Sequence, residues 1–219
     1  MSHAEGDHGG PARREGQRHE GRMTRETAAT NPRQARSVGF FDLQEHVVES
    51  AISVFDSLDV GVTYVVGDTS ASLKGSAVMA VVGYASTTVS GGVLLLASRV
   101  FVDALMPDGL RRRHGASELA LRDVLGEFAN MVAGRLKNRL AMHDLDPLLT
   151  PPTTVFGDEL SLPAPVSGLS AWHRFETGNG NLFMRFDAAF DATFCLSPAD
   201  ESKRPTLREG ELVLWEMDQ

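Results

Sequence analysis

The chain has 219 residues, of which 42% are hydrophobic, and its formal net charge is −8 at pH 7. This length fits one medium-sized domain with a tail better than two full domains, and the apolar content is enough for a core. An acidic surface repels phosphate backbones, so the composition argues against a nucleic-acid partner. The single cysteine, Cys195, allows no intrachain disulfide, which suits a reducing cytosol.

No apolar stretch approaches the length of a membrane span, since the longest one, over residues 92–97, is followed by Ser98 and Arg99. The N-terminus begins Met-Ser-His-Ala-Glu and has no apolar signal core. We therefore expect a cytoplasmic protein without a membrane partner.

Residues 1–38 contain almost no large apolar side chains. Such a segment cannot bury enough surface to offset the entropy of ordering, so it is predicted to be a disordered tail. Folding should begin at Phe40 and Phe41. Apolar residues then recur with helical spacing from Leu43 to Leu58, which predicts an amphipathic helix.

The next segments predict three strands, over residues 60–66, 76–83 and 92–98. The last two are nearly continuous apolar runs joined by a turn at 84–91, so part of the sheet should be covered on both faces. Residues 100–106 predict a short helix that Pro107 ends. A polar, Arg-rich loop is expected over 108–115.

Ser117 is a suitable N-cap for a long helix over residues 118–142, and the prolines that follow keep this helix from continuing. Three more strand-like segments come after it, over 153–156, 168–176 and 181–190. The sequence Gly178-Asn179-Gly180 predicts a hairpin turn between the last two. Residues 198–210 are a polar connector, and 211–216 are a candidate edge strand.

The predicted order is helix, strands, helix, strands, as in two helix-plus-strands units, although no residue-level repeat proves a duplication. Long helices packed against a mainly antiparallel sheet make an α+β fold. The domain organisation expected from this order is a tail over residues 1–38, a folded domain over 39–196 and a C-terminal extension over 197–219.

The polar face of the 118–142 helix carries a carboxylate and a carboxamide three residues apart, Glu127 and Asn130, which are surface neighbours at this spacing. Asp123 lies on the same side. Small residues flank this row and leave a low strip on which another protein could lie. The candidate partner-binding residues are therefore Asp123, Gly126, Glu127, Ala133 and Gly134.

A second interpretation stays open, because every amphipathic helix needs a polar face and E-x-x-N alone is an ordinary pattern. Gly126 and Gly134 each weaken a helix by about 1 kcal/mol relative to alanine. These glycines could serve close packing inside the protein as readily as contact with a partner.

The stretch from Glu118 to Lys137 resembles the central helix of the CheX proteins, in the wider CheC/CheX family of chemotaxis phosphatases, and residues 150–160 resemble the segment that follows it. The family pattern is an Asp or Ser, then E-x-x-N, then a proline about two dozen residues later. The residues that match it in order and spacing are Asp123, Glu127, Asn130 and the pair Pro151-Pro152. The resemblance is strong over 116–160 and rests on layout over 40–115 and 165–195, while the tail and about the last twenty residues fall outside it.

CheC members carry the motif twice. In this chain the first-half helix has Ile52 three residues after Glu49, where an asparagine would be needed. The chain therefore resembles the single-site CheX type.

The resemblance implies a phosphatase that hydrolyses the aspartyl phosphate of a CheY-like receiver domain. Asn130 would orient the attacking water through hydrogen bonds, and Glu127 would pair with the receiver's active-site lysine. These two are the expected catalytic residues, and Asp123 would support the helix end or a neighbouring backbone group. The receiver supplies its own Mg²⁺, so no cofactor or metal is expected in this chain.

The resemblance also implies a homodimer, for which an unpaired sheet edge gives a physical motive. The alternative function is a non-catalytic adaptor that binds a receiver on the same fold, as the flagellar switch proteins, relatives by fold, suggest. Intact Glu127 and Asn130 favour the enzyme. A small-molecule binding domain is a third class, and no feature of the sequence supports it.

Overall fold

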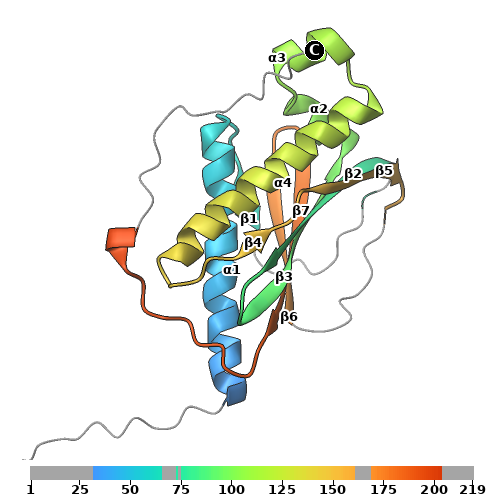
Figure 1. Ribbon diagram of the computed structural model, residues 1–219. Helices are drawn as coiled ribbons and strands as arrows, with labels where there is room; N and C mark the ends of the chain where they lie inside the picture. Colours follow the sequence, from blue (N-terminus) through green and yellow to red (C-terminus); the bar gives the residue numbers. More distant parts are fainter. Residues whose placement is uncertain (1–31, 66–72, 74, 161–168, 204–219) are drawn as a thin grey trace, which may run out of the picture. The chain divides into compact units, whose positions relative to one another are not determined.

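The computed structural model describes residues 32–65, 73, 75–160 and 169–203, all within the compact unit Asn31–Gln219 (Figure 1). The elements of this part of the chain are, in order, α1 (Pro32–Ser57), β1 (Thr63–Val65), β2 (Ser76–Ala85), β3 (Val89–Ser98), α2 (Arg99–Ala104), α3 (Asp108–His114), α4 (Glu118–Ala141), β4 (Leu148–Leu149), β5 (Thr153–Asp158), β6 (Leu169–Thr177), β7 (Gly180–Phe190) and the 3₁₀ turn η1 (Glu201–Lys203).

The described strands form one seven-stranded sheet in which every pairing is antiparallel. The strand order is β1-β6-β7-β3-β2-β4, and β5 pairs with the first half of β2. This arrangement confirms the prediction of an α+β fold with a mainly antiparallel sheet.

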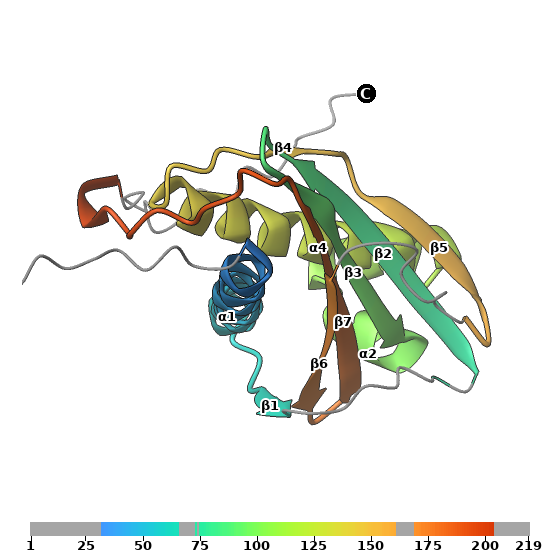
Figure 2. The same ribbon diagram turned by 90° about the horizontal axis from the view of Figure 1, so that it is seen from below.

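Helices α1 and α4 lie on the same side of the sheet (Figure 2). The main core fills the space between them and the strands, with Phe55 of α1 packed between Phe128 of α4 and Phe175 of β6. A smaller cluster centred on Ala77, Leu96 and Phe183 lies apart from this core. Leu96 is fully buried, which agrees with the nearly continuous apolar run of β3.

The predicted hairpin of β2 and β3 is confirmed, but its turn is shorter than the predicted 84–91 because both strands continue to Ala85 and Val89. The buried Tyr84 donates a hydrogen bond from its hydroxyl to the Asp187 carbonyl oxygen of β7, at 2.8 Å. Gly91 of β3 lies beside this bond. A Cβ atom there would overlap the Asp187 carbonyl oxygen and the Tyr84 hydroxyl.

Helix α1 begins at Pro32, so the prediction of a helix starting at Leu43 after a tail of 38 residues is wrong for residues 32–38. Proline is tolerated in the first turn of a helix, where its missing N–H has no intrahelical partner. The predicted disorder of residues 1–31 lies outside the described residues, as does the candidate edge strand at 211–216.

The prediction of a loop over residues 108–115 is also wrong, because Asp108–His114 form α3. Arg111 anchors this helix by donating hydrogen bonds to the carboxylate and the backbone carbonyl of Asp103. Three arginines and a histidine lie in its last turn, where cations interact favourably with the helix dipole. Gly115, at φ +57°, then ends the helix.

Candidate functional site

Helix α4 forms where the sequence predicts it. The Ser117 side chain accepts a hydrogen bond from the Ala120 backbone N–H, at 3.3 Å, and so caps the helix. Its apolar side, which includes Leu121, Leu125, Phe128, Val132 and Leu136, is buried in the main core. Because the apolar side is buried, the opposite side of α4 faces the solvent.

Asp123, Glu127 and Asn130 are all exposed on that side. Within the described part of the chain, none of the three side chains makes a hydrogen bond or an ion pair. On a helix, side chains three or four residues apart are neighbours, with about 5–6 Å between their Cβ atoms. The three polar groups thus form one row that a visiting molecule can reach, which we call the acidic–amide row.

The small residues around this row divide into two groups. Gly134 is partly exposed, and a Cβ atom there would meet nothing within 4 Å. Gly126 and Ala133 are buried, with Ala133 only 2% exposed. The expectation of an open strip is therefore wrong at Gly126 and Ala133, because the chain covers its own helix there.

At Gly126 the covering segment is the start of β5 with the two residues before it. A Cβ atom at Gly126 would come within 3.1 Å of the Thr154 methyl group and 3.8 Å of the Pro152 ring. Arg122 fixes this contact, since its guanidinium donates hydrogen bonds to the Thr154 hydroxyl at 3.3 Å and carbonyl oxygen at 3.1 Å. The absent side chain at Gly126 lets β5 approach α4 closely.

This segment brings Pro151 and Pro152 beside the acidic–amide row, and both prolines are exposed. Thr150 fixes the segment from the other side. Its backbone N–H donates to the Gly83 carbonyl oxygen, and its hydroxyl accepts from the Gly83 N–H, both at 2.9 Å. The structure thus places Pro152 against Gly126, the residue before Glu127 on α4.

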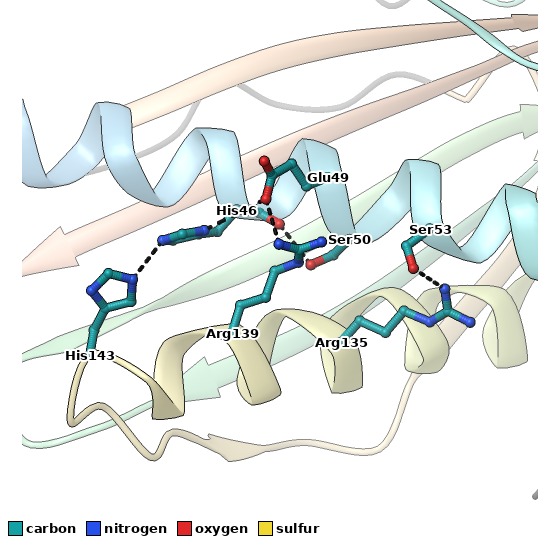
Figure 3. Close-up of polar contacts among 7 residues, drawn as sticks. All are labelled: His46, Glu49, Ser50, Ser53, Arg135, Arg139 and His143. Atoms are coloured by element: carbon teal, nitrogen blue, oxygen red, sulfur yellow. Dashed lines mark hydrogen bonds and ion pairs between the residues drawn. The ribbon is translucent and has the colours of Figure 1, made fainter. Parts of the chain in front are cut away.

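Helix α1 offers no second row of this kind at the matching positions. Glu49 pairs with Arg139 of α4, and Arg135 of α4 donates to the Ser53 hydroxyl (Figure 3). Ile52 is partly buried against the main core. The α1 residues at these positions therefore hold α1 against α4 and the core.

Figure 3 also shows a histidine pair that the sequence did not predict, His46 of α1 and His143 just after α4. Their 97-residue separation left no sequence signal for the pairing.

In the described residues, no group of three or more His, Cys, Asp or Glu side chains is arranged to hold a metal ion. The helices described here include none with the length and apolar character needed to cross a bilayer.

Residues 78–176 match the family model described as "Chemotaxis phosphatase CheX". This match runs from the third residue of β2 through most of β6, including α4 and the proline segment, and it confirms the resemblance predicted from the sequence. No curated protein matches the chain.

Solved structures of chemotaxis proteins share the fold at low identity. CheX from Vibrio vulnificus has a TM-score of 0.57 at 18% identity, with 67% of this chain and 96% of that chain covered. A CheC-like superfamily protein from Shewanella sp. PV-4 has a TM-score of 0.57 at 17% identity, with 68% and 97% covered. The CheX-CheY-BeF3-Mg²⁺ complex from Borrelia burgdorferi matches with a TM-score of 0.52 at 18% identity, covering 67% and 97%.

Proposed function

From the match of residues 78–176 to the CheX family, we propose that this chain is a phosphatase acting on the aspartyl phosphate of a CheY-like receiver domain. The observation that carries the proposal is the exposed pair of Glu127 and Asn130 on α4, with no partner among the described side chains. The similar protein from Borrelia burgdorferi was solved as a complex of CheX with CheY, which supports a CheY-like partner.

The role proposed for Asn130 is to orient water. Its carboxamide can accept a hydrogen bond from the water and donate one to a phosphoryl oxygen. The water oxygen attacks phosphorus and the bond from phosphorus to the aspartyl oxygen breaks, which releases aspartate and inorganic phosphate. An acyl phosphate has a good leaving group, so alignment of the water is the missing contribution.

The role proposed for Glu127 is to align the two proteins. Its carboxylate would pair with the receiver lysine that lies near the phosphoryl group. Such a pair contributes only about 0–1 kcal/mol when it stays exposed, so its main effect is on register and orientation as docking buries it. Asp123 and Gly134 would extend the contact along the helix, and the exposed Pro151 and Pro152 would form its rim.

We further propose a cytoplasmic homodimer whose receiver partner carries the Mg²⁺. Two copies would present two acidic–amide rows. Sedimentation of the purified chain measures its oligomeric state, and a monomer at micromolar concentration would contradict the dimer.

The alternative function is a receiver-binding adaptor without catalysis. The unpaired Asn130 carboxamide favours the phosphatase, since an adaptor has no need of a water-orienting group. The two functions differ in one measurement, which is the rate of phosphate release from a phosphorylated receiver.

The testing experiment mixes the chain with phosphorylated CheY-like receivers and follows phosphate release and binding separately. Replacing Asn130 with alanine should leave binding intact and reduce the acceleration by about 10²–10³-fold, the usual effect of losing one preorganised polar group. Asn138→Ala, on the same helix, is the matched control and should keep full activity. Equal turnover by the wild type and N130A would refute the role of Asn130.

Charge reversal by Glu127→Lys should abolish binding, because it places a cation opposite the receiver lysine. Glu45→Lys makes the same charge change on α1 and should leave binding unchanged. Tight binding by the wild type with no phosphate release from any receiver would favour the adaptor.

A further inference from the structure

His46 and His143 face each other across the junction of α1 and the C-terminal end of α4 (Figure 3). Their Nε2 atoms are 2.9 Å apart, and the ring centroids are 4.8 Å apart. His143 is only 9% exposed, and His46 is partly buried. Two imidazole nitrogens at this distance form a hydrogen bond only if one nitrogen carries a proton and the other does not.

The second nitrogen of His143 fixes which ring donates. His143 Nδ1 lies 2.7 Å from the Ser197 carbonyl oxygen. A carbonyl oxygen only accepts, so Nδ1 of His143 carries the proton and its Nε2 accepts. His46 must then donate from Nε2. Its Nδ1 has no hydrogen-bond partner among the described residues.

Charged residues surround the pair on α1, on α4 and in the segments that follow α4 and surround η1. Glu45 and Glu49 lie on α1, and the Glu49 carboxylate is 4.0 Å from His46 Nδ1. Arg139 of α4 pairs with Glu49. Beyond His143, Asp144 pairs with Lys203, which also lies 3.8 Å from Asp200. Burial, and then the neighbouring His143 and Arg139, lower the pKa of His46, and this effect outweighs the opposing effect of Glu49 and Glu45.

Residues 191–203, which we call the C-terminal strap, pack over this junction. Phe194 is buried, and a Cβ atom at Gly39 of α1 would come within 2.5 Å of its ring. The Asp200 N–H donates to the Met142 carbonyl oxygen at 2.8 Å. His143 lies between these attachments and joins the strap to α1 through Ser197 and His46.

We propose that the His46–His143 pair is a proton-sensitive latch that holds the C-terminal strap against α1 and α4. One added proton enters at His46 Nδ1, towards Glu49, and leaves the bond between the rings intact. A second proton must occupy His143 Nε2, so that two N–H groups and two positive charges face each other. The pair then separates, which breaks the link from the strap through His143 to α1, and the strap detaches.

Cys195 is exposed and is the single cysteine of the chain, so a nitroxide attached to it reports the mobility of the strap directly. In buffers with a metal chelator, the spectrum of the wild type should show an immobilised label at about pH 8 and a mobile label at about pH 5. His46→Gln should remove this transition, since glutamine can donate to neutral His143 and accept from protonated His143. His114→Gln, at an exposed histidine of α3, is the matched control and should retain it.

An unchanged label mobility in the wild type between the two pH values would overturn the latch, and so would a full transition in H46Q. A second measurement needs no variant. Nitrogen NMR of the wild type at about pH 8 should find His143 protonated at Nδ1 and His46 protonated at Nε2. The same tautomer on both rings would rule out the bond between them.

Discussion

Gly126 and Gly134 are the same residue on the same helix, but their surroundings predict opposite effects of an added methyl group. A Cβ atom at Gly134 meets nothing within 4 Å, so Gly134→Ala should raise the free energy of unfolding by about 0.5–1 kcal/mol through helix propensity alone. At Gly126 the new atom would lie 3.1 Å from the methyl group of Thr154, which Arg122 holds in place. Gly126→Ala should therefore gain nothing or be destabilising.

Urea denaturation of the two variants measures this difference. A stabilisation by G126A equal to that of G134A would show that β5 moves away from the helix freely. A phosphatase assay on G134A adds a test of the surface, since a methyl group there would lie within the proposed receiver contact.

Sequence reasoning at this scale succeeds for side chains whose direction the helix alone decides. Helical periodicity predicts that Asp123, Glu127 and Asn130 point away from the core, and they are exposed. Helical periodicity does not predict whether residues at the two borders between the apolar and the polar side of the helix are buried. Whether Gly126 is covered depends on a strand that begins 27 residues later, so its burial belongs to tertiary structure. The functional roles of the row stay predictions.

Substitution of two phenylalanines measures how much the C-terminal strap contributes to the free energy of unfolding. Phe194 lies in the strap, and Phe41 is an exposed control. Phe194 is 5% exposed and lies 4.4 Å from the Phe190 ring, between centroids, whereas Phe41 of α1 is 67% exposed. Phe194→Ala should lower the free energy of unfolding by up to about 3–5 kcal/mol, or release the strap alone at a smaller cost. Phe41→Ala should change it by less than about 0.5 kcal/mol.

Thermal denaturation together with hydrogen exchange distinguishes the two outcomes for F194A. Loss of protection confined to residues 191–203 would mean that the strap detaches as a unit. Equal stability of F194A and the wild type, with full protection of the strap, would contradict the packing described here.

At the scale of helices and strands, the sequence predicts the elements whose apolar residues recur at a regular spacing. It misses the elements that depend on a single contact with another part of the chain. The long helix α4 and the main strands follow from period and capping. Helix α3 has few apolar residues, and it depends on Arg111 reaching back to Asp103. The two-residue strand β4 depends on pairing with the end of β2. The strap is anchored by contacts with α1 and α4, from which it is far away in the sequence.

For the whole molecule, the buried histidines make stability depend on pH. His173 is 4% exposed, and burial lowers its pKa from 6.5 to about 4. The unfolded chain binds this proton near pH 6.5 while the folded chain does not, so the free energy of unfolding falls as pH drops from about 6.5 to about 4. The difference corresponds to on the order of 3 kcal/mol. His46, whose pKa is also lowered, adds to the loss in the same direction.

Urea denaturation across this pH window, for the wild type and His173→Phe, isolates the contribution of His173. The phenylalanine ring keeps the contact with the Tyr64 ring but cannot titrate, so H173F should lose less stability on acidification. Identical pH profiles of the two proteins would show that His173 has the same pKa in the folded and the unfolded chain, and would contradict the lowered pKa.

The fold class follows from the order of elements, and the order of strands in the sheet does not. Alternating and continuous apolar runs predict helices on an antiparallel sheet, and the two hairpins follow from their turns. The placement of β7 beside β3, and of β1 at the edge beside β6, joins the two halves of the chain in one sheet, and Phe55 contacts both halves through Phe101 and Phe175. The contact between Phe55 and Phe175, for example, links residues 120 positions apart.

Gly91 has a consequence for anyone who redesigns this sheet. The Asp187 carbonyl oxygen and the Tyr84 hydroxyl occupy the volume that any other amino acid would need there, while the adjacent Gly92 has its nearest neighbour 3.6 Å from a Cβ atom. A library over β3 can therefore offer alanine beside glycine at the buried position 92 but must encode glycine at position 91.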